Sequence, residues 1–171
     1  KEYVDFSSND YLGLSSHPAL VAAAREALDR YGVGAGASRL MSGNLSIHHE
    51  LEEEVAAFKS TESALVFNSG YQANMGIIPA LFGRHDLVLA DHYCHASQLD
   101  GALLSRATLV RFRHNDPGHL SDLLDKHRGE FRRCLVMTES VFSMDGDRAP
   151  LASLLEVSRR HQCFFMVAEA H

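Results

Sequence analysis

The chain has 171 residues, a formal net charge of −6 and 46% hydrophobic residues, which suits one folded domain and excludes intrinsic disorder. It has no Lys/Arg cluster and no apolar run of membrane-spanning length, so neither nucleic acid nor a membrane is an expected partner. The three cysteines lack the spacing of a disulfide framework or a CxxC pair, which favours a reducing, cytoplasmic compartment.

The first 60 residues are predicted to form an N-terminal segment of helices and loops. One helix begins at Pro18, which suits the first helical position, and ends at Gly32, which suits a C-terminal cap. The glycine-containing loop over residues 32–43 is not a dinucleotide fingerprint, because it follows a helix rather than a strand. Ser46 is expected to cap the next helix, and the three glutamates at 52–54 are expected on its solvated face.

Strands and helices are predicted to alternate over residues 61–171. The expected strands are residues 64–67, 87–90, 108–112, 134–138 and 164–167. Apolar residues at helical spacing follow residue 70, and the same spacing recurs from residues 96, 117 and 150. Short apolar strands between helices indicate an α/β fold, a largely parallel sheet flanked by helices.

A Ser-Gly turn joins the expected strand at 64–67 to the helix after it. Ser69, Gly70 and Tyr71 stand where backbone N–H groups lack helical partners and the helix dipole favours an anion. Gly70 lets the backbone approach a ligand, and Ser69 can add a hydroxyl donor. The turn therefore predicts either a phosphate site or an ordinary helix cap.

Polar residues follow the later strands, and parallel strands present their carboxyl ends at one edge of a sheet, where ligands bind. These residues are Asp91, His92, Cys94 and His95, then Glu139, Ser143 and Asp145, and finally Glu169 and His171. A metal site at 92–95 is one alternative, but a completed tetrahedral ligand set is not apparent. A Ser143–His171 nucleophile pair is another, but no nucleophile-elbow pattern surrounds Ser143.

Several stretches, in order along the chain, resemble the α-oxoamine synthases, pyridoxal-phosphate enzymes of fold type I. They are FSSNDYLGL at 6–14, GASRLMSG at 36–43, NSGYQAN at 68–74, HAS at 95–97, RHND at 113–116 and ESVFSMDGDRAPL at 139–151. The first and last are most similar to the 8-amino-7-oxononanoate synthase branch, which acts in biotin biosynthesis. The resemblance implies that residues 61–171 form the first part of an aspartate aminotransferase-like, PLP-binding major domain.

The resemblance also implies roles for single residues. The cofactor-binding set is Ser69, Gly70, Tyr71, His95, Glu139, Ser143, Ala168 and His171, with Asn9 near the substrate amino acid. In this set the amides of Gly70 and Tyr71 hold the phosphate, and His95 stacks on the pyridine ring. Ser143 and His171 hydrogen-bond near the phenolic oxygen. His95, Ser143 and His171 are thus the residues expected to take part in catalysis, and no metal is implied.

The implied reaction is the decarboxylative condensation of L-alanine with pimeloyl-CoA or a pimeloyl carrier protein. The cofactor serves there as an electron sink. Sibling reactions of the 2-amino-3-ketobutyrate ligase or serine palmitoyltransferase type are the alternative. Family members are homodimers, which implies a homodimer here, with the loop at 32–43 near the partner's cofactor.

Two positions depart from the family pattern. The family usually has Asp three residues before the histidine that matches His171, and this chain has Ala168 there. That Asp keeps the pyridine nitrogen protonated, and Glu169 would point to the other face of a strand. The lysines of this chain, Lys1, Lys59 and Lys126, match no family motif, so the Schiff-base lysine is expected beyond residue 171.

Three interpretations remain open. The chain is part of a full enzyme in which position 168 has changed, or a degenerate non-catalytic subunit, or a binding module that kept the fold. The intact set of Ser69, Gly70, Tyr71, His95, Ser143 and His171 favours the first, and further sequence is also expected before Lys1.

Overall fold

The computed structural model describes residues 3–171. The chain divides into two compact units, one ending at Val66 and the other beginning at Phe67. This division lies a few residues beyond the boundary expected after residue 60. Each unit is described by itself.

Two helices form the first unit: α1 (Pro18–Tyr31) and α2 (Ser46–Lys59). The predicted start and end of α1 are confirmed, since Pro18 is its first residue and Gly32 caps it with φ 76°. The prediction that Ser46 caps α2 is wrong, because Leu45 holds that position. The His48 Nδ1 atom accepts the Leu45 N–H over 3.0 Å, and this contact closes the first turn.

Glu52 on α2 corrects the expectation that its acidic run simply faces solvent. Its carboxylate binds the Arg39 guanidinium through two contacts of 2.5 and 2.9 Å, and it accepts the Val66 N–H over 2.8 Å. The Arg39 hydrogen bonds, with the Val66 amide, lower the pKa of Glu52 to about 2. One side chain thereby ties the glycine-containing loop and the end of the unit to α2.

We expect Glu52→Gln to lower the stability of the full-length protein at neutral pH and to have little effect in strong acid. A carboxyl group whose folded pKa lies below its unfolded value stabilises the fold above the unfolded value, 4.5 here. That contribution is lost as the pH falls towards 2. Urea unfolding of both proteins from pH 7 to pH 3 checks this, with Glu53→Gln as the matched control. A difference that stays constant across this range would contradict the assignment.

Residues 64–67 do not form the predicted strand. Their backbone is irregular, and no strand in the described part of the chain pairs with them. The Val66 peptide instead bonds to the Glu52 carboxylate and accepts from Arg39. An apolar run becomes a strand only when a neighbour completes its hydrogen bonds.

The second unit holds a parallel four-stranded sheet, which confirms the predicted fold class. Its strands are β1 (Leu87–Asp91), β2 (Thr108–Phe112), β3 (Cys134–Glu139) and β4 (Phe164–Ala168), in the order β2-β1-β3-β4. Its helices are α3 (Gly70–Leu81), α4 (Ala96–Ser105), α5 (Pro117–His127) and α6 (Leu151–Arg160), with a 3₁₀ turn at Arg128–Glu130.

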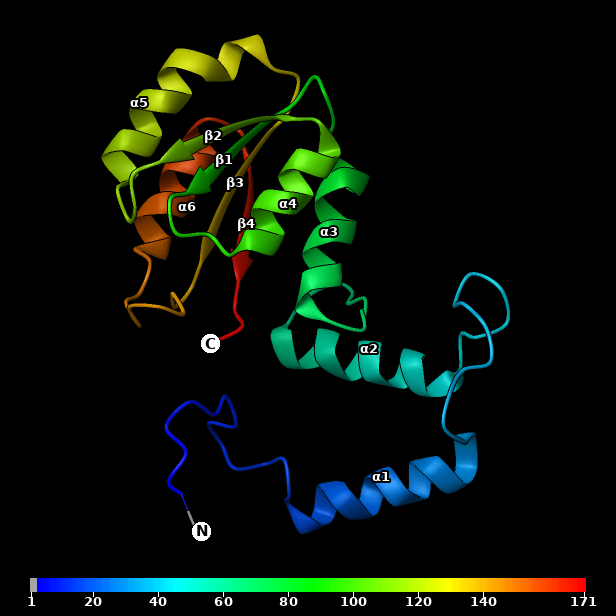
Figure 1. Ribbon diagram of the computed structural model, residues 1–171. Coiled ribbons are helices and arrows are strands. Elements are labelled where there is room, and N and C mark those ends of the chain that lie inside the picture. Colours follow the sequence, from blue (N-terminus) through cyan, green and yellow to red (C-terminus); the bar gives the residue numbers. More distant parts are fainter. Residues whose placement is uncertain (1–2) are drawn as a thin grey trace. The chain divides into compact units, whose positions relative to one another are not determined.

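Helices cover both faces of this sheet: α5 and α6 lie on one face, and α3 and α4 on the other (Figure 1). Each face of the sheet has its own hydrophobic core, and alternate residues of a strand pack into opposite cores. Leu87 and Leu89 pack toward α5 and α6, while Val88 and Ala90 pack toward α3 and α4. The central strands β1 and β3 are buried along their whole length and apolar up to their polar C-terminal residues, as the sequence predicts, whereas the outer strands β2 and β4 are partly exposed.

A glycine lets α3 approach α4 closely. A Cβ atom on Gly101 of α4 would lie 2.7 Å from the Asn74 carbonyl oxygen of α3. Packing at this range holds the N-terminal ends of α3 and α4 beside each other. The Ser-Gly turn and His95 begin these two helices, so the packing fixes their relative position.

Candidate functional site

The candidate site lies at the carboxyl edge of the sheet. Strand order reverses between β1 and β3, and ligands of open α/β sheets bind at such switch points. A cavity of about 220 Å³ is found there. It is lined by Gly70, Tyr71, Asn74, His95, Ser97, Glu139, Ser143, Ala168, Ala170 and His171.

The N-terminus of α3 forms one wall of the cavity. Ser69 caps the helix, and its hydroxyl accepts the Gln72 N–H over 3.2 Å. The amides of Gly70 and Tyr71 start the helix, where no internal acceptor exists for them. Apart from its chain neighbours and the backbone of its own helix, no atom lies within 4 Å of where a Gly70 Cβ would stand, so the backbone is open to a ligand. This wall can therefore bind an anion.

His95 is held from two sides. The Glu139 carboxylate, at the end of β3, accepts its backbone N–H over 2.6 Å. Its ring Nδ1 accepts the Ser97 N–H over 3.1 Å and lies 2.8 Å from the Ser97 hydroxyl, which accepts from the Asn74 amide. With Nδ1 as acceptor, Nε2 carries the proton of the neutral ring. These contacts fix a flat side chain at the cavity.

Ser143 lies on a tight turn after β3. Val141 and Arg148 form an isolated bridge, and the Phe142 N–H donates to the Asp147 carbonyl oxygen over 3.0 Å. Gly146 closes the turn with φ 70°, a conformation that favours glycine. Ser143 lines the main cavity and also a neighbouring one of about 250 Å³.

The end of β4 completes the wall. Ala168, Ala170 and His171 line the cavity, whereas Glu169 between them does not. The Ala168 methyl group is thus on the cavity side, where the family pattern has an acid. Lys126, the one lysine of the second unit, lies on α5 and does not line the cavity.

Every residue of the expected cofactor-binding set lines this cavity except Ser69, which caps α3 next to it. Asn9 belongs to the first unit, where its side chain accepts from the Tyr11 hydroxyl over 3.3 Å. The sequence did not single out Asn74 and Ser97, although both stand in the stretches that carry the resemblance.

The sequence also did not predict a buried network beside the cavity. His114 lies 2.8 Å from the Asp91 carboxylate through Nδ1 and 2.8 Å from the Asp147 carboxylate through Nε2. Asp91 is fully buried and also accepts the N–H groups of Tyr93 and Asn115. The Asn115 amide donates to Asp147 over 2.6 Å.

An imidazole with a carboxylate at each nitrogen is held as the doubly protonated cation. Burial opposes this charge, but the hydrogen bonds to Asp91 and Asp147 prevail and raise the pKa of His114. The cation joins the turn that leads from β1 to His95 with the turn that carries Ser143. His114 therefore fixes the spacing of two cavity walls without lining the cavity.

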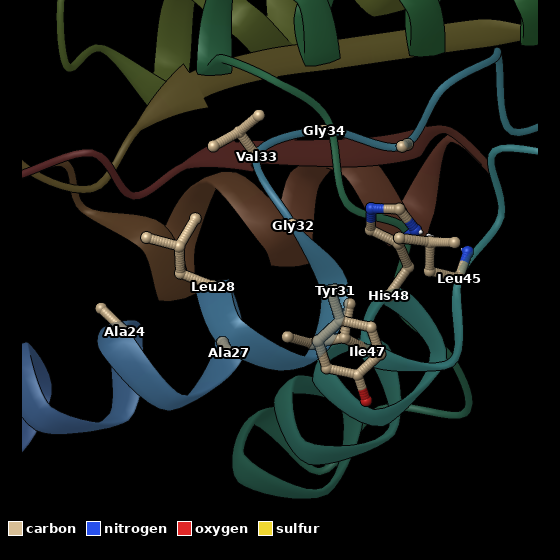
Figure 2. A pocket seen from close by; sticks show the side chains of 11 residues that line it. Ala24, Ala27, Leu28, Tyr31, Gly32, Val33, Gly34, Leu45, Ile47 and His48 are labelled. Carbon is tan, nitrogen blue, oxygen red and sulfur yellow. Dashed lines mark hydrogen bonds between the residues drawn. The ribbon is translucent and has the colours of Figure 1, made fainter.

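A different pocket is the larger one. It measures about 490 Å³ and lies within the first unit, between the end of α1 and the start of α2. Figure 2 shows the mainly apolar side chains around it, among them Leu28, Val33 and Ile47, with Tyr31 and His48. None of the expected site residues lines it, and it offers few groups for chemistry.

Residues 3–171 contain neither a candidate metal site nor a candidate membrane span. No group of three or more His, Cys, Asp or Glu side chains is arranged to hold a metal ion, so the structure offers no support for a site at 92–95. No helix in this range is long and apolar enough to cross a membrane.

Known proteins are similar to this chain over most or all of its length. The family model for aminotransferase class I and II matches residues 1–171. An 8-amino-7-oxononanoate synthase of Geobacter sulfurreducens is 56% identical over the whole chain. A serine palmitoyltransferase of S. paucimobilis with bound PLP and myriocin superposes with a TM-score of 0.88 at 39% identity, over 92% of this chain and 39% of that one. The 8-amino-7-oxononanoate synthase of Francisella tularensis gives 0.76 at 34% identity, over 96% of this chain and 44% of that one.

The chain is shorter than the relatives it matches. It spans 44% of the length of the Geobacter relative.

Proposed function

The chain belongs to the class I and II aminotransferase family, and we propose that the full-length protein is a pyridoxal-phosphate-dependent 8-amino-7-oxononanoate synthase. It would join L-alanine to a pimeloyl thioester with loss of CO₂. The observation that carries the proposal is the 56% identity to such a synthase over all 171 residues.

The cavity fits most of a pyridoxal phosphate. The α3 start supplies amides for a phosphate, with open space at Gly70, and His95 supplies a flat face for a ring. The wall at Ala168 does not fit as well, because it offers a methyl group where the pyridine nitrogen of the family's cofactor meets an acid. When bound, the cofactor supplies an electron sink for the amino-acid carbon that loses CO₂.

In this proposal, backbone amides and side chains of the chain bind and orient the cofactor and the substrate. The amides of Gly70 and Tyr71 would hold the phosphate, and the His95 ring would lie against the pyridine. Glu139 holds the His95 backbone in place. Ser143 and His171 would hydrogen-bond near the phenolic oxygen. The family resemblance assigns Asn9 to the substrate amino acid.

His95→Ala should weaken pyridoxal-phosphate binding by the full-length protein about fivefold, the equivalent of roughly 1 kcal/mol for one lost aromatic contact. Because the His95 ring also caps α4, this substitution removes a helix cap as well. Two matched variants separate these effects: His95→Asn keeps a capping acceptor, and His95→Phe keeps a ring. We expect Ala and Asn to weaken binding and Phe to retain it, as measured by cofactor titration and absorbance. If Asn binds normally and Phe does not, the cap matters rather than the stacking.

Assaying the full-length protein with alanine, glycine and serine against acetyl, pimeloyl and palmitoyl thioesters tests the function. The proposal expects 8-amino-7-oxononanoate from alanine and a pimeloyl thioester as the preferred product. A preference for serine and palmitoyl-CoA is the second candidate, since serine palmitoyltransferase structures are also close. A preference for glycine with acetyl-CoA would overturn both.

The proposal includes a homodimer in the cytoplasm. Neither α1 nor α2 contains a buried residue, and Leu20, Leu28 and Phe58 expose 50, 49 and 86% of their surface. Apolar surface on this scale supports a partner subunit or further chain packed on these helices. Sedimentation of the full-length protein decides the oligomeric state, and a monomer at micromolar concentration would contradict the dimer.

A further inference from the structure

Two cysteines lie side by side at the edge of the sheet opposite the candidate site. Cys134 is the first residue of β3, and Cys163 directly precedes the first residue of β4. The strands pair in parallel with Leu135 beside Phe164, so the two cysteines lie one step earlier in the same register. Both pack against the same core, on the face that α5 and α6 cover.

Their spacing suits a disulfide. Neighbouring strands lie about 4.8 Å apart, within the Cα separation of about 4.4–6.8 Å that disulfides span. Cys163 stands outside the paired residues of β4 and follows a turn in which Gln162 has φ 54°. Its N–H donates to the Ser158 carbonyl oxygen over 2.9 Å rather than to β3, so the sheet does not hold its amide.

The two thiols differ in exposure and in charge. Cys134 is fully buried, whereas Cys163 is only partly buried. The Arg128 guanidinium donates to the His161 carbonyl oxygen over 3.0 Å, and the Cys163 thiol contacts that same oxygen at 3.6 Å. A cation thus stands close to Cys163. A hydrogen bond from the Cys134 thiol also lowers the pKa of Cys163, although burial opposes it, and the pKa of Cys134 rises.

We propose that Cys134 and Cys163 form an oxidation site at which a hydroperoxide converts the two thiols into a disulfide. This inference does not depend on the proposed function, because it concerns the edge of the sheet remote from the cavity. Cys163 is the attacking residue, since it is the more exposed and lies beside Arg128. Cys134 resolves the product.

The oxidation takes place in two steps, attack on the peroxide and then formation of the disulfide. The Cys163 thiolate attacks the terminal peroxide oxygen, the O–O bond breaks, and after proton uptake Cys163 is a sulfenic acid and the peroxide leaves as an alcohol or water. The Cys134 sulfur then attacks the Cys163 sulfur, forms the S–S bond and expels hydroxide, which takes the Cys134 proton and leaves as water. The peroxide is reduced by two electrons, and the thiol pair is oxidised by two.

Peroxide treatment of the reduced full-length protein tests the inference, followed by alkylation and peptide mass spectrometry. We expect a cross-linked pair of peptides that contain Cys134 and Cys163, with a loss of two hydrogens that dithiothreitol restores. Cys94 is the internal control: it is buried, its thiol contacts the Met137 carbonyl oxygen at 3.5 Å, and burial raises its pKa. It should oxidise at least about tenfold more slowly, because so little thiolate is present.

The variants separate the two roles. In Cys134→Ser the sulfenic acid on Cys163 has no resolving thiol, so a cyclic dione should trap it there. In Cys163→Ser, peroxide should leave Cys134 reduced. Oxidation of Cys94 at the same rate, or a stable sulfenic acid without cross-link in the unsubstituted protein, would overturn the proposal. So would a protein in which neither Cys134 nor Cys163 reacts.

Discussion

Replacing Ala168 with aspartate is expected to raise the turnover of the full-length protein about 100-fold or more, the equivalent of roughly 2.7 kcal/mol in activation free energy. Ala168 lines the cavity and offers only a methyl group. A pyridine nitrogen with no acidic partner in a partly enclosed site tends to lose its proton, which weakens the ring as an electron sink. A carboxylate at this position would favour the protonated ring. Phosphate binding should change little, because Gly70 and Tyr71 bind through the backbone.

Two independent measurements compare the unsubstituted protein with Ala168→Asp. They are the turnover and the absorbance of the bound cofactor. Ala170→Asp is the matched control, since Ala170 lines the same cavity two residues further along. It adds the same charge and should not raise turnover. Equal turnover of the unsubstituted protein and Ala168→Asp would mean that another group, such as Glu169, meets the nitrogen. No turnover in either form would favour the degenerate-subunit interpretation.

Asp91→Ala is expected to lower the free energy of unfolding by about 3–5 kcal/mol, the usual cost of removing one partner of a buried ion pair. Asp91 is fully buried, and its loss leaves the N–H groups of Tyr93 and Asn115 and one nitrogen of His114 without their acceptor. Asp145→Ala removes an exposed carboxylate from the neighbouring turn and serves as the control. Urea unfolding measures both. A cost below about 1 kcal/mol for Asp91→Ala would show that the network contributes little.

The pH dependence of stability tests the same network. The pKa of His114 is raised in the folded protein, so its charge stabilises the fold fully below the unfolded value of about 6.5. That contribution disappears as the pH rises through the higher folded pKa. The stability difference between the unsubstituted protein and His114→Gln should therefore be larger at pH 6 than at pH 9. A difference that grows with pH would contradict the cationic assignment.

Most of the sheet could be predicted because apolar runs of four to five residues between helices leave few alternatives. β1 to β4 were each predicted to within one residue at their C-terminal ends. Residues 64–67 have the same apolar pattern and form no strand, because the Val66 peptide bonds to the side chains of Arg39 and Glu52. Composition does not reveal which acceptor a peptide will find.

The site was predictable where its residues share a local motif. Ser69, Gly70 and Tyr71 follow from the rules of helix ends, and His95, Glu139, Ser143, Ala168 and His171 from the resemblance to a family, whereas Asn74, Ser97 and Ala170 were not singled out. The contact between His114 and Asp147 was not predictable, because it spans 33 residues and depends on the order of the strands and the geometry of a turn. The spacing of residues along the chain does not indicate such contacts.

A crystal structure of the full-length protein with pyridoxal phosphate tests the central claim most directly, since the claim concerns where one ligand binds. We predict the phosphate within hydrogen-bonding distance of the Gly70 and Tyr71 amides, and the pyridine ring against His95. The same density should lie beside the methyl group of Ala168. Cofactor bound elsewhere, or a cavity that stays empty at saturating cofactor, would contradict the account.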